Sequence, residues 1–333
     1  MSRMIVKRPD YLAVVEAAYA PCASDTDWLK GIAEVALPIL DQGLGVHAWS
    51  YDASAPAADR MRGFGQAGGD PSLEQGSRQF VAALPAEILP IFFPARPPVE
   101  VMHRVFDRVQ PNLDMIRAMG VARVGDAIGL RGHNPDGKGV VLAAATHGPA
   151  KIPPRMTWSL TRIALHLASA ARLRFHSPVA SRLEDADAIF TPKGRLEHVA
   201  TREAGADATR VLPNAVERRL AANGVRADPK RALELWRALV GGRWSVVDHV
   251  DRDGKRFILA KSNTPGVDEP VALTTSERLV LVYASWGHSN KLIAYEMGVS
   301  PAMVSTQLGS ALRKLRLSSR AELMRFFAGR GAP

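Results

Sequence analysis

The chain has 333 residues, 47% of them hydrophobic and 23% charged, and its formal net charge is +10. A chain of this length is expected to form about two or three domains, and its composition excludes a disordered or fibrous protein. The one cysteine, Cys22, excludes an intramolecular disulfide and favours a reducing compartment. No apolar run has the length of a membrane span, so we expect a cytoplasmic protein with no membrane partner.

The first predicted domain covers residues 1–176. Apolar spacing predicts helices over Tyr11–Tyr19 and Asp27–Leu40, followed by an extended run over Leu44–Tyr51. A helical region broken by several prolines is expected over Leu73–Val109. The order of these segments points to helices that pack against a sheet.

Two β-rich runs, Ala122–Leu130 and Gly139–Thr146, flank the segment GHNPDGKG, and an amphipathic helix is expected over Pro154–Phe175. The segment differs from a phosphate-binding loop because its last residue is glycine and a strand-like run follows it, so it predicts a hairpin turn and no ATPase. The whole arrangement predicts an α+β sensor. It resembles a GAF domain, which implies a small-molecule pocket or a dimerisation surface.

Three residues of the first extended run are candidate pocket residues. His47, Trp49 and Tyr51 alternate along the run, and strand residues two apart share a face. They are expected either to line a ligand pocket or to pack in the core. The histidines lack metal-ligand spacing and no nucleophile motif appears, so we expect no metal, no cofactor, no catalytic residue and no enzyme.

A second predicted module covers residues 186–263. Turns of the type Pro-Lys-Gly and Arg-Asp-Gly lie within ADAIFTPKGRLEHV and GRWSVVDHVDRDGKRFILA, which predicts two hairpins. Helices are expected between them, over Ala215–Ala222 and Pro229–Val240, the latter capped by Asp228. The module resembles a small PAS domain, and residues 264–272 are expected to link it to a third domain.

The third predicted domain covers residues 273–328 and is the basic end of the chain. Thr274 and Glu277 have the spacing of a capping box, and Gly287 is expected to end the first helix. A second helix over Lys291–Met297 and a third over Pro301–Leu315 are separated by a tight Gly-Val-Ser turn, which is the helix-turn-helix arrangement. A fourth helix is expected from Ser319, with an aromatic-rich end that favours pairing with a second copy.

This third domain resembles the LuxR-type (GerE-type) helix-turn-helix family. The resemblance is carried by Leu273, Thr274, Glu277, Val280, Leu281, Ala284, Gly287, Ser289, Asn290, Lys291, Ile293, Ala294, Gly298, Val299, Ser300, Val304, Lys314, Leu315, Ser319, Arg320, Ala321 and Leu323. It implies an all-α four-helix domain that binds double-stranded DNA as a homodimer in transcription control. The chain departs from the family at Ser276, Leu292, Met303 and Gln307.

The candidate DNA-contacting residues lie on the second and third helices of this domain: Ser289, Asn290, Lys291, Ser300, Ser305, Thr306, Gln307, Arg313 and Lys314. We expect Arg313, Lys314 and the residues at the start of the second helix to hold phosphates. Specificity is expected from Thr306, Ser305, Arg313 and DNA shape, because the short side chains cannot make the bidentate contact of an arginine with guanine.

The fold class is therefore expected to be multidomain α+β with an all-α helix-turn-helix. The expected function is that of a one-component transcription regulator whose N-terminal region senses a small-molecule ligand or dimerises. RNA polymerase is an expected partner if the protein is an activator. Two alternatives remain open, a sigma-factor-like promoter reader and a ligand-processing enzyme with a DNA-binding output.

Overall fold

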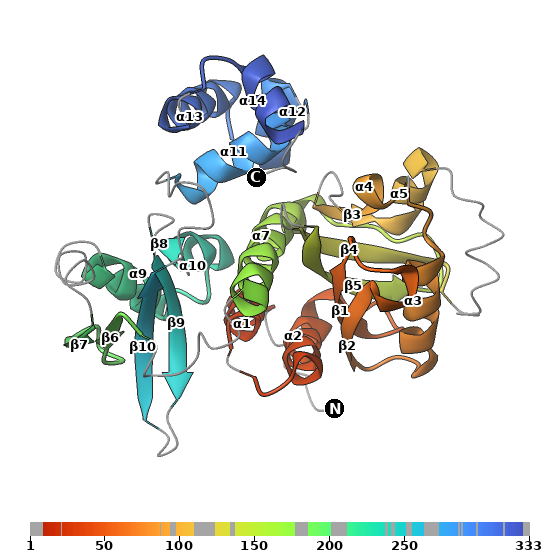
Figure 1. Cartoon of the computed structure of the whole chain (residues 1–333), viewed down its shortest axis with the longest axis horizontal. Coiled ribbons are helices and arrows are strands. Elements are labelled where there is room, and N and C mark those ends of the chain that lie inside the picture. Colours follow the sequence, from red (N-terminus) through yellow and green to blue (C-terminus); the bar gives the residue numbers. More distant parts are fainter. Residues whose placement is uncertain are drawn as a thin grey trace, which may run out of the picture.

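A computed structural model describes residues 9–20, 22–86, 88–93, 98–109, 124–133, 137–176, 186–200, 212–236, 239–240, 244–250, 255–262, 273–285, 287, 289–297, 299–315 and 317–328. These residues form two mixed α/β regions and a helical region (Figure 1). None of the helices described is both long enough and apolar enough to cross a membrane.

The first region is built on a five-stranded antiparallel sheet with the strand order β2-β1-β5-β4-β3. At its centre, Trp49 pairs with Phe64 on one side and with Val141 on the other. The strands are β1 (Val46–Asp52), β2 (Met61–Ala67), β3 (Val99–Val101), β4 (Asp126–His133) and β5 (Lys138–Thr146). A sheet in this order places the first strand of the region, β1, beside the last, β5.

Helices cover both faces of this sheet. Because successive strand residues point to opposite faces, Val46 and Ala48 join one core, whereas Trp49 and Tyr51 join the other. The first core is closed by α1 (Tyr11–Ala18), α2 (Asp25–Leu40) and α7 (Pro154–His176). The second core is closed by α3 (Ser72–Ala83), α4 (Leu89–Phe92) and α5 (Met102–Val109), while η1 (Ala57–Asp59) joins β1 to β2.

The sequence-based prediction of a broken helical region over Leu73–Val109 is only partly right. It contains α3, α4 and α5, but Val99–Val101 is a strand that pairs with β4. The strand Met61–Ala67 was not predicted at all. Its sequence MRGFGQA has two glycines, which lower strand propensity, and pairing with β1 outweighs that preference.

Two glycines permit unusually close packing of helices on the sheet. A Cβ atom at Gly65 of β2 would collide with the backbone nitrogen of Lys30 in α2. A Cβ atom at Gly132 of β4 would likewise collide with the backbone nitrogen of Ala168 in α7. Both helices therefore rest directly on the sheet backbone at these points.

The second region repeats the topology of the first. Its strands β6 (Ala188–Phe190), β7 (Leu196–Val199), β8 (Leu239–Val240), β9 (Trp244–Val250) and β10 (Arg256–Ser262) form an antiparallel sheet in the order β7-β6-β10-β9-β8. Numbered within each region, both orders are 2-1-5-4-3. In both regions the first hairpin also contains a shift in register. The two hairpins predicted from the turns are confirmed.

Two helices lie between β7 and β8, α9 (Leu212–Gly224) and α10 (Pro229–Leu235). Asp228 caps α10 by accepting a hydrogen bond from the Arg231 backbone, as its position before Pro229 predicts. The predicted helix over Pro229–Val240 is too long, because α10 ends at Leu235 and Leu239–Val240 pairs with β9.

The second region docks on α1 and α7 of the first. Trp236, at the end of α10, is 1% exposed and packs against Tyr19 and His166 at ring-centroid distances of 4.9 and 5.3 Å. Burial lowers the pKa of His166 to about 3, assisted by the charges of Arg162 and Arg219. His166 is therefore neutral at this junction near neutral pH.

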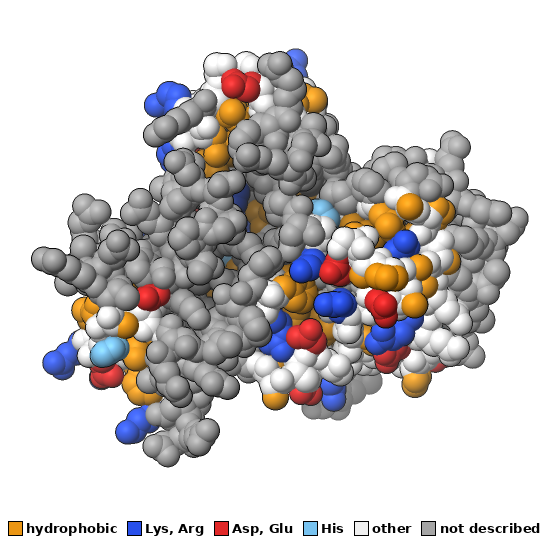
Figure 2. Space-filling model, in the orientation of Figure 1, with side chains coloured by type: hydrophobic (Ala, Val, Ile, Leu, Met, Phe, Trp, Pro, Cys, Tyr) orange, Lys and Arg blue, Asp and Glu red, His pale blue; other side chains and the backbone are white. Residues whose placement is uncertain are grey.

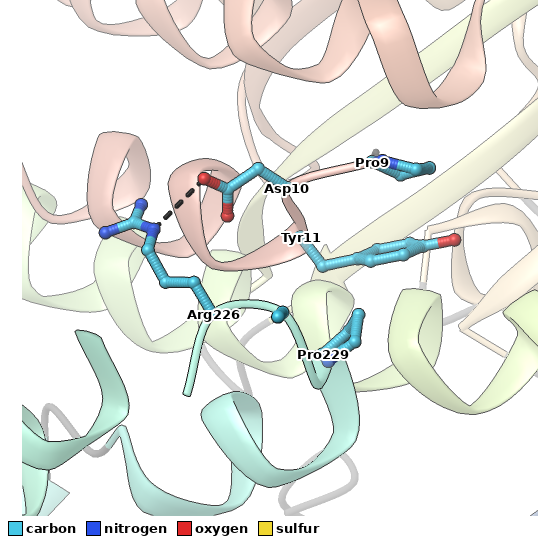
Figure 3. Close-up of a pocket in the computed structure, with 6 residues that line it drawn as sticks. Pro9, Asp10, Tyr11, Arg226 and Pro229 are labelled. Carbon is cyan, nitrogen blue, oxygen red and sulfur yellow. Dashed lines mark hydrogen bonds and ion pairs between the residues drawn. The ribbon is translucent and has the colours of Figure 1, made fainter. Parts of the chain in front are cut away.

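Arg226 completes the junction at the surface. Its Nε lies 3.0 Å from Asp10, just before α1 (Figure 3). Its Nη2 lies 2.6 Å from Glu16, near the other end of α1. An open pocket of about 500 Å³ lies beside this ion pair and is lined by Pro9, Asp10, Tyr11, Arg226, Ala227 and Pro229 (Figure 3). The junction thus combines an aromatic core with a charged rim.

The helical region comprises α11 (Thr275–Ser285), α12 (Asn290–Met297), α13 (Pro301–Lys314) and α14 (Arg320–Ala328), which form a separate lobe above α7 in Figure 1. The core of this lobe includes Val280, Ile293, Val304 and Leu308. Leu165 of α7 packs against the same core, and α12 contacts α7. The lobe is therefore attached to the first region through α7.

Candidate nucleic-acid interface and ligand face

Local hydrogen bonds set the start and the end of α11. Glu277 Oε2 accepts from the Thr274 backbone N–H at 2.6 Å, and Thr274 Oγ1 accepts from the Glu277 backbone N–H at 3.1 Å. This is the reciprocal capping box that the sequence predicts. Gly287, with φ +81, follows the end of α11 in the left-handed conformation that glycine adopts readily.

The turn between α12 and α13 also follows the prediction. Ser300 caps α13 by accepting a hydrogen bond from the Met303 backbone N–H at 3.2 Å, and Pro301 occupies the first position of the helix. The Val299 backbone N–H donates to the Ala294 carbonyl at 3.0 Å, which ties the turn to α12. Helices α12 and α13 are therefore the helix-turn-helix pair.

Helix α13 has one buried face and one exposed face. Val304, Leu308 and Ala311 are buried in the lobe core. The opposite face consists of exposed residues: Ala302, Ser305, Thr306, Gly309 and Arg313. Lys and Arg side chains appear at the outer edge of this lobe in Figure 2. The exposed face has the placement that a recognition helix needs to enter a major groove.

Six of the nine predicted DNA-contacting residues are exposed: Ser289, Lys291, Ser300, Ser305, Thr306 and Arg313. The other three are partly buried and face neighbouring helices. Asn290 Oδ1 accepts a hydrogen bond from Arg320 Nη1 of α14 at 3.2 Å. Gln307 has a buried Oε1 with no hydrogen-bond partner. The third is Lys314.

Lys314 joins α13 to α11 through Glu277. Its Nζ lies 2.8 Å from Oε1 and 2.7 Å from Oε2 of Glu277, and Ser310 donates to Oε1 at 2.6 Å. Burial alone would raise the pKa of Glu277, but the hydrogen bonds from Lys314, Ser310 and Thr274 outweigh it and lower the pKa to about 2. The capping-box pattern identifies Glu277, but its link to Ser310 and Lys314 has no local sequence signal.

The start of α14 differs in detail from the predicted capping box. Ser319 accepts from the Glu322 backbone N–H at 3.1 Å, as expected. The Glu322 carboxylate instead accepts from the Ser318 backbone N–H at 2.7 Å and from the Ser318 hydroxyl. The side chains of the predicted aromatic end of this helix, Phe326 and Phe327, lie outside the described residues.

The candidate ligand residues His47, Trp49 and Tyr51 are all buried on the face of β1 that α3 and α4 cover. The Tyr51 ring stacks on Phe93 at 4.1 Å, and its hydroxyl lies 2.8 Å from Nδ1 of His133. Burial lowers the pKa of His47 to about 4, and its Nδ1 has no hydrogen-bond partner. The structure thus brings the three predicted residues together on one face, which we call the ligand face.

Sequence reasoning missed a buried ion pair on the same face of this sheet. Arg131 of β4 and Glu100 of β3 are 3% and 6% exposed, with 3.7 Å between Nη2 and Oε2. Arg131 also donates to the Phe92 carbonyl at 3.4 Å. In the part of the chain that the structure describes, no group of three or more His, Cys, Asp or Glu side chains is placed to hold a metal ion.

Comparison with known proteins identifies the helical lobe. Residues 271–327 match the family described as bacterial regulatory proteins, luxR family. No curated protein matches the chain. Two solved structures are remotely similar. Escherichia coli SdiA has 10% identity and a TM-score of 0.26, covering 86% of this chain and 83% of that one. SdiA in complex with octanoyl-rac-glycerol has 11% identity and a TM-score of 0.25, covering 86% and 81%.

The family match covers α11 to α14 and includes both helices of the helix-turn-helix. It agrees with the exposed face of α13 and with the capped turn that precedes it. Residues 271–327 are therefore a DNA-binding domain of the luxR family of bacterial regulatory proteins, and the chain that carries this domain is a DNA-binding transcription regulator.

Proposed function

We propose that the protein is a one-component regulator in which residues 1–176 sense a small molecule and control the DNA-binding domain at 273–328. The observation that carries this proposal is the contact between α7 and the DNA-binding domain. Helix α12 contacts α7, and Leu165 packs against the core of that domain. Leu165 belongs to α7, the helix that covers the first sheet, so one element touches both the sensing region and the DNA-binding domain. Residues 186–263 form a middle module fixed on the same helix.

DNA contacts are assigned to the exposed candidates on α12 and α13. Lys291, Ser289 and Ser300 lie near helix N-termini, where backbone N–H groups and positive charge favour phosphates. Arg313 contributes a phosphate or base contact from the far end of the exposed face of α13. Asn290 and Lys314 are assigned to holding the domain together, because their polar groups face α14 and Glu277. Gln307 is assigned no DNA contact, because its Oε1 is buried.

The active form is proposed to be a homodimer, because a symmetric pair of recognition helices matches half-sites about one helical turn apart. A signal that changes the position of α7 would change the spacing of the two helices. RNA polymerase is the proposed partner if the output is activation. The sigma-factor-like alternative requires a helical polymerase-binding region upstream, and residues 46–146 contain a five-stranded sheet instead.

The ligand face is the proposed sensing site. His47 offers a buried nitrogen, while Trp49, Tyr51 and Phe64 offer aromatic surface, a combination typical of small-molecule sites. We also propose a GAF-like fold for the first sheet region and a PAS-like fold for the second, two regions that share one strand order. No reaction is proposed at this face.

DNA binding is tested by titrating the full chain against random-sequence duplex at several salt concentrations. Arg313→Ala and Lys291→Ala should each reduce the slope of log K against log salt by about one. DNA binding whose affinity does not change with salt concentration, or a slope that neither variant changes, would refute the contact assignment.

Ligand binding is tested by a thermal-shift screen of small molecules against the wild type and His47→Phe. A compound that raises the melting temperature of the wild type and of His47→Phe equally does not bind at the ligand face.

A further inference from the structure

The hydroxyl of Thr306 is already engaged within the recognition helix. Thr306 Oγ1 donates to the Ala302 carbonyl at 3.1 Å, four residues earlier on α13. Such a bond occupies the one proton that the side chain can donate. Thr306 is exposed, so its methyl group and the lone pairs of Oγ1 are what it offers to DNA.

Two neighbours of Thr306 on the exposed face, Ala302 and Gly309, have no polar side-chain groups, whereas Ser305 carries a hydroxyl. Ala302 ends in a methyl group, and Gly309 has open space where a Cβ would lie. Met303, which borders this face, is 49% exposed and presents a thioether. At 100° per residue Ala302, Thr306 and Gly309 share one side of the helix with Arg313, the first residue along it that carries several N–H donors.

A surface of short side chains whose centre presents methyl groups fits one base better than the others. In the major groove only thymine presents a methyl group, whereas guanine, adenine and cytosine are distinguished by their donors and acceptors. We propose that α13 reads thymine methyl groups, with Thr306 as the principal specificity-determining residue and Ala302 and Met303 extending the contact. This inference rests on the proposed DNA-binding function and names the feature of the operator that the domain recognises.

The size of the effect follows from the area involved. Removing one buried methyl from the contact is expected to weaken binding about four-fold. Two half-sites read by a dimer would multiply such factors, provided that both helices engage. The discrimination is thus modest at each base and depends on the number of thymines contacted.

The test uses the full chain and duplexes selected from a random-sequence pool. In the most enriched duplex each thymine is replaced in turn by deoxyuridine, which removes only the methyl group. We expect about four-fold weaker binding at one or more positions in each half-site. Thr306→Ser keeps the hydroxyl and loses the methyl, so it should bind the thymine and uridine duplexes equally at the position that Thr306 contacts. Thr306→Val keeps a methyl and loses the hydroxyl, so it should retain the discrimination.

Three outcomes would overturn the inference. The first is equal affinity for thymine and uridine at every position. The second is loss of discrimination in Thr306→Val with retention in Thr306→Ser, which would show that the oxygen is read. The third is salt-dependent binding with no enriched sequence, which leaves DNA binding intact but removes thymine reading. Absence of any salt-dependent binding would instead refute the proposed function itself.

Discussion

The carboxylate of Glu277 and the ammonium of Lys314 lie 2.7 Å apart, although 37 positions separate them in the sequence. Glu277 lies in the first turn of α11 and Lys314 ends α13, so the pair joins the first helix of the DNA-binding domain to the recognition helix. Glu277 is 5% exposed and also receives the Ser310 hydroxyl. A charged pair of this kind fixes the rotation of α13 relative to the core.

Glu277→Gln should destabilise the DNA-binding domain by about 2 to 3 kcal/mol, because it leaves Lys314 without its anionic partner at a largely buried position. The measurement is chemical denaturation of the full chain, monitored by hydrogen exchange of amides in α11 and α13. Glu34→Gln is the matched control. Glu34 pairs with Lys30 on the surface of α2, and its loss should cost about 0.5 kcal/mol or less. Equal effects of the two variants would contradict the assignment.

Lys314 and Arg313 are adjacent in sequence but should behave differently. Lys314→Met should lower the stability of the domain and leave the salt slope of DNA binding nearly unchanged, because its charge is directed at Glu277. Arg313→Ala should reduce that slope by about one and leave stability within about 0.5 kcal/mol, because Arg313 is exposed. Salt titrations and thermal melts of the two variants check this. The reverse pattern would return Lys314 to the set of phosphate contacts.

Stability should fall steeply in mild acid because two buried histidines must become charged. Burial lowers the pKa of His47 to about 4 and that of His166 to about 3, whereas both titrate near 6.5 when unfolded. Their contribution is therefore complete above about pH 6.5 and is lost as pH falls, down to about 4 for His47 and about 3 for His166. While both titrate, the loss is about 3 kcal/mol per pH unit for the pair. His166→Gln should roughly halve that slope. A slope unchanged in His166→Gln, or reduced equally in the exposed control His198→Gln, would contradict this.

Glu277 adds an acid dependence at lower pH. Its pKa is lowered to about 2, below its ordinary value of 4.5, so its contribution is present above about pH 4.5 and is lost as pH falls toward about 2. The lost contribution is about 3 kcal/mol at most. In the variant Glu277→Gln this second loss should disappear while the histidine-dependent loss remains. Unfolding measured across this pH range separates the two.

Trp236→Ala should detach the middle module from α1 and α7. Removing a ring that is 1% exposed is expected to cost about 3 to 5 kcal/mol and to split unfolding into two transitions. Arg226→Gln, at the rim of the same junction, should cost only about 1 kcal/mol because its side chain is 34% exposed. Calorimetry of both variants checks the difference. A single transition in Trp236→Ala would show that the two regions are held together elsewhere.

The features predicted from sequence were those with local causes. Three such features depend on residues within one turn of a helix: the capping box of Thr274 and Glu277, the glycine after α11 and the cap at Ser300. The strand Met61–Ala67 was missed because its glycines oppose strand formation, and its partners β1, α2 and α3 stabilise it. Its Gly65 is required by the approach of α2, which a pattern along one segment cannot reveal.

The candidate DNA-contacting residues could be predicted from the sequence to a similar extent. Exposure of Ser305, Thr306 and Arg313 follows from helical periodicity around Val304 and Leu308. The role of Lys314 does not, because a basic residue near the end of a recognition helix has the same pattern whether it faces phosphate or a buried carboxylate. Only the packing of α11 on α13 distinguishes the two.

Helix α7 is in contact with the first sheet, with the middle module and with α12 of the DNA-binding domain. Under the proposed function, these three bodies adjust together through the shared helix, and their binding equilibria are thermodynamically linked. If a small molecule on the ligand face changes the affinity for DNA by some factor, DNA must change the affinity for that molecule by the same factor. Operator DNA added to the protein would then serve as a reagent for finding the signal, since it would tighten or weaken the binding of the correct compound and leave others unaffected.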